Sequence, residues 1–208
     1  MHSSDPQSIP TRYTLLSRLN DWDDQESWKD FFDTYWQLIY ATAMKSGLTE
    51  AEAQDVVQET VICVAKDIHK FERDRRKGSF KGWLHQIIRW RVADQMRKRK
   101  PASQGRSELT FEEFCQLAEQ VPDETVPARE QFWEDQWRQN LFEAAVARVK
   151  RRVKEEHYQI FDLYVMKQWP AKKIKSVLRV SLAQIYVAKH RVGALIKKEV
   201  KALEQKYS

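Results

Sequence analysis

Apolar residues in this sequence recur at intervals of three and four residues in almost every stretch that shows a pattern. This spacing places them on one face of an α-helix. The segment 25–45 is the clearest case, because Trp28, Phe31, Tyr35 and Ile39 follow one another along a single stripe. Alternating β-branched runs and Asn-Gly or Asp-Gly hairpin turns are both missing from the sequence. The pattern therefore predicts an all-α fold.

Local signals divide the helical pattern into segments. Thr49 followed by Glu52 forms a capping box, so we expect a second helix to start there and to run to about His69. The polar stretch 70–79 predicts a loop. A third helix is expected to follow this loop and to end in the four consecutive basic residues 97–100.

The length of 208 residues fits one or two small domains, and the composition suggests where they lie. We expect an N-terminal tail at 1–24, a first small helical domain at 25–100, an acidic linker at 101–130 and a second helical domain at 131–208. The linker prediction rests on three prolines, on its acidic charge and on a single short amphipathic piece at 111–117.

The net charge of +6 hides a strong alternation along the chain. Residues 1–65 carry a net charge of −7, residues 66–101 of +9, residues 102–147 of −7 and residues 148–208 of +11. Two basic blocks separated by acidic ones predict two contact surfaces for a polyanion such as nucleic acid. The alternative is that both blocks are solvated helix faces.

Several classes of protein are excluded by what the sequence lacks. Glycine is scarce, with 5 residues, and no glycine-rich phosphate loop occurs. Cys63 and Cys115 form no Cys-x-x-Cys motif, which excludes a disulfide framework and a structural zinc site. The longest apolar run is the five residues 61–65, too short to span a membrane. The polar segment 1–10 lacks a signal-peptide pattern. We therefore expect a cytoplasmic protein without a metal or cofactor.

The C-terminal region has the spacing of a helix-turn-helix. A short helix at 171–178 precedes a break at 179–181 and a long basic helix that runs from 182 to about 203. The predicted core positions are Ile174, Val177, Leu178, Val180, Leu182, Ile185, Val192 and Ile196. The alternative is an ordinary helix pair with a basic outer face.

The outer arc of the long helix is predicted to enter the major groove, where glutamine and arginine read base edges. Tyr186 lies at the flank of this arc. Lys189 falls inside the apolar arc, so its ammonium is expected to reach toward a phosphate. The predicted duplex-contacting residues are Ser181, Ala183, Gln184, Tyr186, Val187, His190 and Arg191.

Two further sets of residues lie in the N-terminal half. On the helix from 49 to 69, Asp55, Gln58 and Glu59 are expected to face outward together with the apolar Ile62. An apolar residue among carboxylates suggests a basic protein partner, although a scattered surface isoleucine is the alternative.

The second set interleaves aromatic and basic residues, which is the combination that stacks the bases and holds the phosphates of single-stranded DNA. For each aromatic residue the alternative is burial in the core, and Trp83 and Leu84 are expected there. The predicted residues are Phe71, Arg75, Arg76, Lys77, Phe80, Arg89, Trp90, Arg91 and Arg97.

With these motifs, residues 28–100 and 131–203 resemble the extracytoplasmic-function branch of bacterial RNA polymerase sigma factors. The run Asp55-Val-Val-Gln-Glu-Thr60 looks like the family's region 2 helix, and Gly78-Ser-Phe-Lys-Gly-Trp-Leu84 like the start of its promoter-melting segment. The C-terminal helix-turn-helix resembles region 4, which reads the −35 element.

The resemblance implies a specific set of partners. Asp55, Gln58, Glu59 and Ile62 would bind the clamp of the β′ subunit of core RNA polymerase, which also contacts sigma factors through its β subunit. The aromatic and basic set would melt and read the −10 element of promoter DNA, with the loop 71–79 capturing an extruded base. The acidic linker corresponds to the segment that threads toward the polymerase cleft. An anti-sigma protein is the regulator that the family implies.

The sequence departs from the family at three positions. Trp90 stands where asparagine is common, Lys175 where a small alanine packs between the helices, and Arg179 where the turn has glycine.

Two other functions fit parts of the chain. A stand-alone helix-turn-helix regulator explains the C-terminal region but leaves the first 100 residues without a task. A metal-dependent nucleic-acid enzyme would use paired carboxylates such as Asp55 and Glu59, but no histidine joins such a pair at ligand spacing. We therefore expect no catalytic residues.

Overall fold

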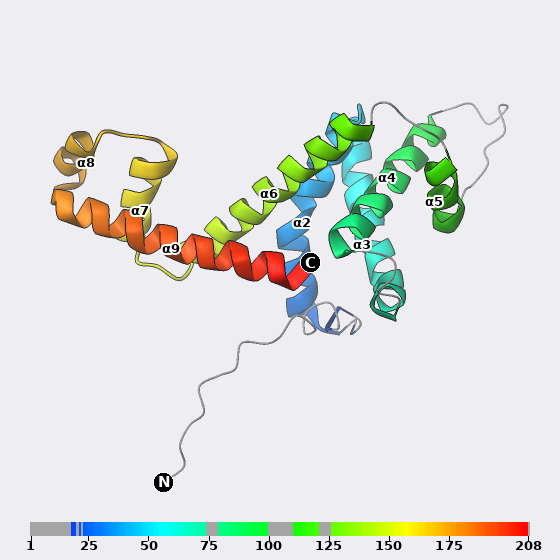
Figure 1. Ribbon diagram of the computed structural model, residues 1–208, viewed down its shortest axis with the longest axis horizontal. Coiled ribbons are helices and arrows are strands. Elements are labelled where there is room, and N and C mark those ends of the chain that lie inside the picture. Colours follow the sequence, from blue (N-terminus) through cyan, green and yellow to red (C-terminus); the bar gives the residue numbers. More distant parts are fainter. Residues whose placement is uncertain are drawn as a thin grey trace, which may run out of the picture. The chain divides into compact units, whose positions relative to one another are not determined.

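The computed structural model describes residues 18–19, 21, 23–73, 79–99, 110–120 and 126–207. Every regular element in this part of the chain is a helix (Figure 1), which confirms the predicted all-α fold. The chain divides into two compact units, residues 1–137 with 206–208 and residues 138–205. No helix in the described part is both long enough and apolar enough to cross a membrane.

The first unit is built on three helices, α2 (Gln25–Lys45), α3 (Glu50–Arg73) and α4 (Phe80–Lys98). Each of them packs against the other two (Figure 1). A shorter helix, α5 (Phe111–Gln120), lies against α4, and the first half of α6 (Val126–Lys150) completes the unit.

The ends of these helices follow the capping signals of the sequence. The Thr49 backbone N–H donates to Glu52 Oε2 at 2.8 Å and the Glu52 N–H donates to Thr49 Oγ1 at 3.4 Å, which confirms the predicted capping box. Ser79 caps α4 by accepting from the Gly82 N–H at 3.2 Å. The α3 helix continues to Arg73, four residues beyond the predicted end.

Aromatic rings fill the centre of the first unit. Phe31, Tyr35 and Phe80 are each 1% exposed or less, and the Phe80 ring centroid lies 5.8 Å from that of Tyr35. Such ring pairs add about 0.5–1.5 kcal/mol beyond the apolar area that they bury. This cluster joins the middle of α2 to the first residue of α4.

The first half of α6 belongs to this aromatic core. The Trp137 ring stacks on Tyr35 with centroids 5.5 Å apart, and Trp133 stacks on His85 at 4.3 Å. Lys81 forms an ion pair with Glu134. The compact unit that contains α7 to α9 begins at residue 138, so Trp133 and Trp137 lie in the first unit with their stacking partners.

The second unit contains the rest of α6, then α7 (Glu155–Phe161), the π-helical turn η3 (Asp162–Met166), α8 (Ala171–Leu178) and α9 (Leu182–Tyr207). A small core joins these elements. Its buried members are Ile160, Leu163, Ile174, Val180, Ile185 and Ala188. Arg148 of α6 pairs with Glu199 of α9 at 3.2 Å, and Arg152, which follows α6, pairs with the same carboxylate at 3.0 Å.

Two of the predicted core positions in the second unit are wrong. Val177 is 58% exposed and Leu182 is 42% exposed. The eight-residue α8 buries only a narrow stripe centred on Ile174, and Val177 lies beside that stripe. On α9 the buried face is centred on Ile185 and includes Ala188, so Leu182 lies at its edge.

Candidate nucleic-acid interface

The outward face of α3 matches the sequence prediction at three of four positions. Asp55 and Gln58 are exposed, and Ile62 is 49% exposed. These three side chains form a small surface of mixed acidic, polar and apolar character, which we call the α3 face.

Glu59 was predicted to face outward, but in the structure its carboxylate is engaged by two cations. Its Oε1 lies 3.0 Å from Lys98 Nζ and its Oε2 lies 3.7 Å from Arg91 Nη1, and its side chain is 29% exposed. Both cations are on α4, so Glu59 connects the two helices. Burial alone would lower the pKa of Lys98, but hydrogen bonds to Glu59 and Asp94 outweigh it and raise that pKa.

Phe80 is a core residue and is not placed to contact DNA as predicted. It is 1% exposed, and its ring contacts Phe31, Tyr35 and Trp83. Phe71 is half-buried and stacks on Trp83 with ring centroids 5.0 Å apart. The first turn of α4 directs its aromatic side chains inward because α2 and the end of α3 pack around it.

Trp90 presents a partly exposed indole between two neighbours. The Arg91 guanidinium lies 3.9 Å from the Trp90 ring centroid, a cation–π contact, and the Phe111 ring lies 5.5 Å away. Arg89 is also half-buried beside it in the sequence. The predicted residues Arg75, Arg76 and Lys77 fall outside the described residues.

The basic end of α4 is held by carboxylates. Arg97 Nη2 lies 3.0 Å from Asp94 Oδ1, and Lys98 contacts both Asp94 and Glu59. Burial alone would raise the pKa of Asp94, but hydrogen bonds from Arg97 and Lys98 lower it.

Arg99 reaches back to the start of α3. Its Nε donates to Glu52 Oε1 at 2.7 Å and its Nη2 donates to the Gly47 carbonyl at 3.1 Å. The hydrogen bonds from Arg99, with those from Thr49, lower the pKa of Glu52 to about 2. Every described cation at the end of α4 therefore has a carboxylate partner, which the sequence did not reveal.

The helix-turn-helix of the second unit has the predicted order of a short helix, a turn and a long helix. Arg179 forms the turn with φ 55° and ψ 37°, the left-handed conformation that glycine adopts most easily. The Gln184 N–H donates to Ser181 Oγ at 3.1 Å and the Ser181 N–H donates to Gln184 Oε1 at 2.7 Å. Gln184 thus closes a capping box, and its carbonyl oxygen is engaged there.

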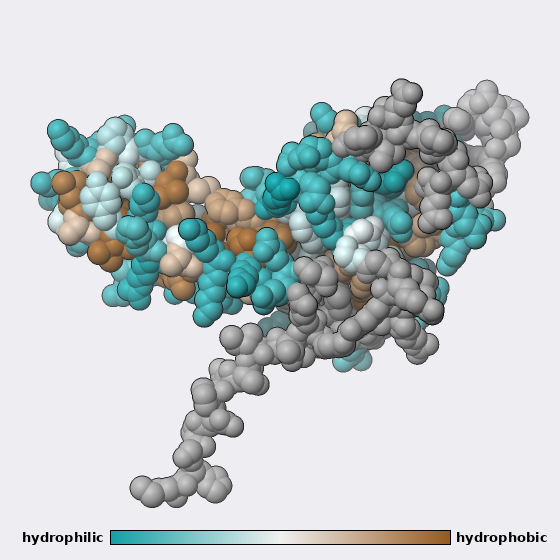
Figure 2. Space-filling view, viewed as in Figure 1, coloured by the Kyte–Doolittle hydropathy of each residue, from teal (hydrophilic) through white to brown (hydrophobic). Residues whose placement is uncertain are grey.

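The remaining predicted positions on α9 are exposed. Val187 is 58% exposed and Tyr186 is 46% exposed, and Ala183, His190 and Arg191 are exposed as well. Figure 2 shows hydrophobic residues among hydrophilic ones on the visible side of the second unit.

The edge of this surface carries aromatic contacts. The Tyr186 ring meets Tyr164 edge to face at 6.0 Å, and Lys189 Nζ lies 5.5 Å from the Tyr164 ring. Lys189 was predicted to fall inside the apolar arc, but it is exposed and its ammonium lies over the Tyr164 ring.

A groove of about 210 Å³ lies beside the start of α9. Its lining residues come from two helices and are Glu156, His157, Ile160, Ala183, Gln184 and Val187. The three α7 residues were missed by sequence reasoning, because nothing in their local pattern indicates proximity to α9. Among the described residues no group of three or more His, Cys, Asp or Glu side chains is arranged to hold a metal ion.

Residues 31–101 match the family described as sigma-70 region 2. The chain is 27% identical over 131 residues to the ECF RNA polymerase sigma factor SigE of Mycolicibacterium smegmatis, a match that covers 63% of this chain and 46% of the relative. It is 32% identical over 78 residues to the ECF RNA polymerase sigma factor SigW of Bacillus subtilis, covering 38% of this chain and 40% of the relative. The chain thus spans less than half the length of these curated relatives.

Proposed function

Because the chain contains a sigma-70 region 2 and is a relative of extracytoplasmic-function sigma factors, we propose that it binds core RNA polymerase and directs promoter recognition and transcription initiation. The observation that carries this proposal is the match to region 2, which spans most of α2 and all of α3 and α4. Those three helices form one packed unit, so the matched segment is a folded domain.

Core binding is assigned to the α3 face, with the β′ clamp as the partner. Asp55, Gln58 and Ile62 offer acidic, polar and apolar groups within about two helical turns. A basic or mixed surface complements this combination. Glu59 supports the surface from behind by holding α4, and a partner that engages it has to compete with Lys98.

Contact with the −10 element is assigned to the surface of α4 around Trp90. Arg89, Trp90 and Arg91 combine cations with a partly exposed indole, the chemistry that binds single-stranded DNA. The predicted residues Arg75, Arg76 and Lys77 extend this assignment, while the buried Phe80 is removed from it.

Contact with the −35 element is assigned to the exposed arc of α9, in a region 4 that the domain prediction places at 131–208. Ala183, Val187, His190 and Arg191 face solvent together, and Tyr186 borders them. The engaged Oε1 of Gln184 leaves its Nε2 as the group that can reach a base. The protein acts without catalytic residues of its own and in the cytoplasm, where the polymerase works, and an anti-sigma protein is its proposed regulator.

The test is co-purification with bacterial core RNA polymerase, followed by run-off transcription on a mixed genomic template. Stable binding and new start sites are expected. Ile62→Asp is expected to abolish binding, because it places a carboxylate in the apolar part of the α3 face. Gln37→Asp on α2 adds the same carboxylate at another exposed position and should bind as the unchanged protein does.

Failure of the folded protein to bind core polymerase would contradict the proposal. In that case tight, sequence-selective binding of duplex DNA by the protein alone would identify a stand-alone helix-turn-helix regulator. Equal loss of binding in both variants would show that the α3 face is not the contact.

A further inference from the structure

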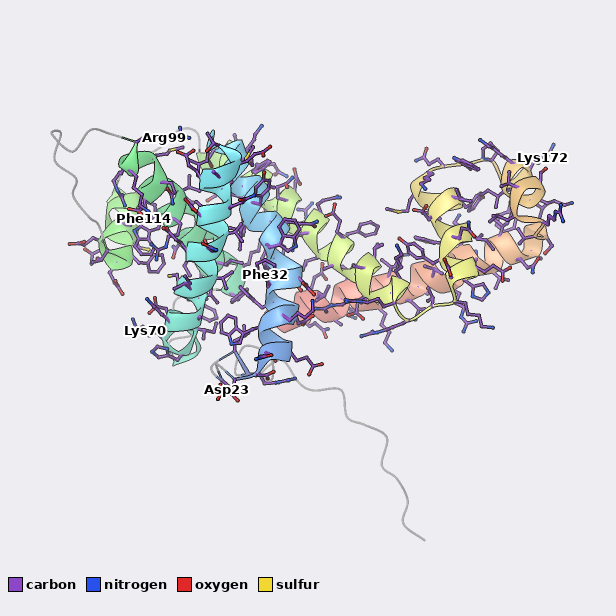
Figure 3. All side chains as sticks on the ribbon, turned by 180° about the vertical axis from the view of Figure 1, so that it is seen from behind. Asp23, Phe32, Lys70, Arg99, Phe114 and Lys172 are labelled. Atoms are coloured by element: carbon purple, nitrogen blue, oxygen red, sulfur yellow. The ribbon has the colours of Figure 1, made fainter. Side chains whose placement is uncertain are left out.

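The helix α5 covers part of the α4 surface that contains Trp90. The Phe111 ring lies 5.5 Å from the Trp90 ring with the two planes tilted by 56°. One turn further along α5, the Cys115 thiol donates to Gln86 Oε1 at 3.8 Å. Figure 3 shows α5, with Phe114 labelled, beside α4. Since Gln86 and Trp90 are one turn apart on α4, the two helices touch along a line and not at a single point.

The contact between α5 and α4 includes the Trp90 ring, on which a nucleic-acid base could stack. The Trp90 ring has the Arg91 guanidinium 3.9 Å from its centroid and the Phe111 ring 5.5 Å away. A nucleic-acid base binds to tryptophan by stacking on the ring and gains a phosphate contact from a nearby arginine. Phe111 therefore lies against the ring on which a base would stack.

The outward side of α5 opposes DNA by charge. The helix carries three glutamates and no lysine or arginine, whereas α4 carries a net charge of +4. Glu112 and Glu113 are exposed, while Phe111 and Cys115 are half-buried toward α4. The apolar side of α5 thus covers Trp90, and its acidic side meets any approaching phosphate with like charge. Glu112 also raises the pKa of Lys70 on α3, after the larger effect of Asp67.

The helix has a capped N-terminus but is short. Thr110 and Glu113 make a capping box, with the Thr110 N–H donating to Glu113 Oε2 at 2.7 Å. However, α5 has 10 residues, and isolated helices of that length are marginal in water. We therefore expect the order of α5 to depend on its contact with α4.

We propose that α5 is an intramolecular competitor of DNA, which occupies Trp90 and must leave α4 before single-stranded DNA binds there. This inference rests on the proposed function, because it uses the assignment of the Trp90 surface to melted promoter DNA. The competitor is part of the chain itself, in the segment that the sequence predicted as an acidic linker.

The experiment locks α5 in place through its native cysteine. In Gln86→Cys the new thiol lies opposite Cys115, and a short bis-maleimide joins the two. Cys63 is 4% exposed and is not expected to react. Binding of a fluorescent single-stranded 20-mer of mixed sequence to the 208-residue chain is measured by anisotropy before and after the reaction. We expect the linked protein to bind at least about fivefold more weakly than the same variant before linking.

The opposite perturbation releases α5. Phe111→Asp removes the ring from Trp90 and is expected to tighten binding of the 20-mer by about fivefold or more. Gln116→Asp adds the same charge at an exposed position of α5 and should not tighten it. Adding Trp90→Ala to Phe111→Asp should remove the gain, since the base then has no ring to stack on.

Unchanged binding after linking would overturn the proposal, and so would the absence of any gain in Phe111→Asp. Binding of core polymerase is measured on the same proteins and separates the two inferences. If core binding fails while linking still weakens binding of the 20-mer, the proposed function is wrong and the competition remains. If core binding succeeds and linking has no effect, only the competition is wrong.

Discussion

Reversing the charge of Glu59 is expected to destabilise the first unit, although the residue lies on the same side of α3 as Gln58 and Ile62. The change Glu59→Lys replaces a carboxylate 3.0 Å from Lys98 Nζ and 3.7 Å from Arg91 Nη1 by a third cation. Both attractive contacts between α3 and α4 then become repulsive.

The size of the effect follows from the exposure of the three groups. Exposed ion pairs contribute about 0.2–1 kcal/mol each, and two charges 4 Å apart interact by about 1 kcal/mol in water and about 4 kcal/mol at an effective dielectric constant of 20. The Arg91 side chain is 20% exposed and that of Lys98 is 47% exposed. Solvent therefore screens the Glu59–Lys98 pair more than the Glu59–Arg91 pair. Losing two attractions and gaining two repulsions is expected to cost about 2–4 kcal/mol, and Glu59→Gln about 0.5–1.5 kcal/mol.

Tryptophan fluorescence isolates the response of this unit. Of the 8 tryptophans, all but Trp169 lie in residues 1–137. The urea midpoint followed by fluorescence therefore reports on the first unit, while the circular dichroism signal follows both. Gln58→Lys is the control, because it adds the same charge at an exposed neighbouring position and should change the free energy of unfolding by less than about 0.5 kcal/mol.

Two outcomes would refute this reasoning. If Glu59→Lys unfolds at the same urea concentration as Gln58→Lys, the contacts to α4 carry no free energy. If Lys98→Glu added to Glu59→Lys restores none of the loss, the destabilisation does not come from that pair.

Three further changes test other parts of the structure. Arg179→Val should lower the free energy of unfolding, measured in urea by circular dichroism, by about 1–2 kcal/mol. Arg179→Gly should be at least as stable as the parent, because glycine adopts φ 55° without steric cost. Since hydrogen bonding from Arg99 holds the pKa of Glu52 at about 2, below its ordinary value, the stability that it contributes is complete above about pH 5 and is lost as the pH falls toward 2. The fluorescence-detected urea midpoint should accordingly decline less with acid in Glu52→Gln than in the parent. Gln184→Ala should cost about 0.5–1 kcal/mol of stability by opening the capping box at Ser181, and retention of full stability would show that the box is dispensable.

Features that depend on one helix and its neighbours in sequence were predictable. The Thr49 capping box, the helical segments and the exposure of Asp55, Gln58 and Ile62 all follow from periods of three and four and from local hydrogen bonding. These signals act within one turn of helix, so a single sequence contains them in full.

Features that depend on contacts between helices were not predictable in the same way. Phe80 was assigned to DNA because it stands among basic residues, but the rings of Phe31 and Tyr35, far away in the sequence, bury it. Trp133 and Trp137 fall within the segment 131–208 that the sequence predicts as the second domain, but their ring partners are on α2 and α4. A helical period shows that a residue lies on an apolar stripe and leaves open which element covers the stripe.

Ion pairs between helices are the clearest example of contacts that the sequence did not predict. The basic residues at the end of α4 belong to the basic block 66–101, which predicted a contact surface for nucleic acid. In the structure Arg97 pairs with Asp94, Lys98 with Glu59 and Arg99 with Glu52, so these cations hold α4 against α3 and against its own last turn. A phosphate that approaches this end has to compete with three carboxylates already in place. The cationic surface of α4 for DNA is therefore smaller than the sequence count indicates, which gives the Trp90 ring a larger share of the proposed contact.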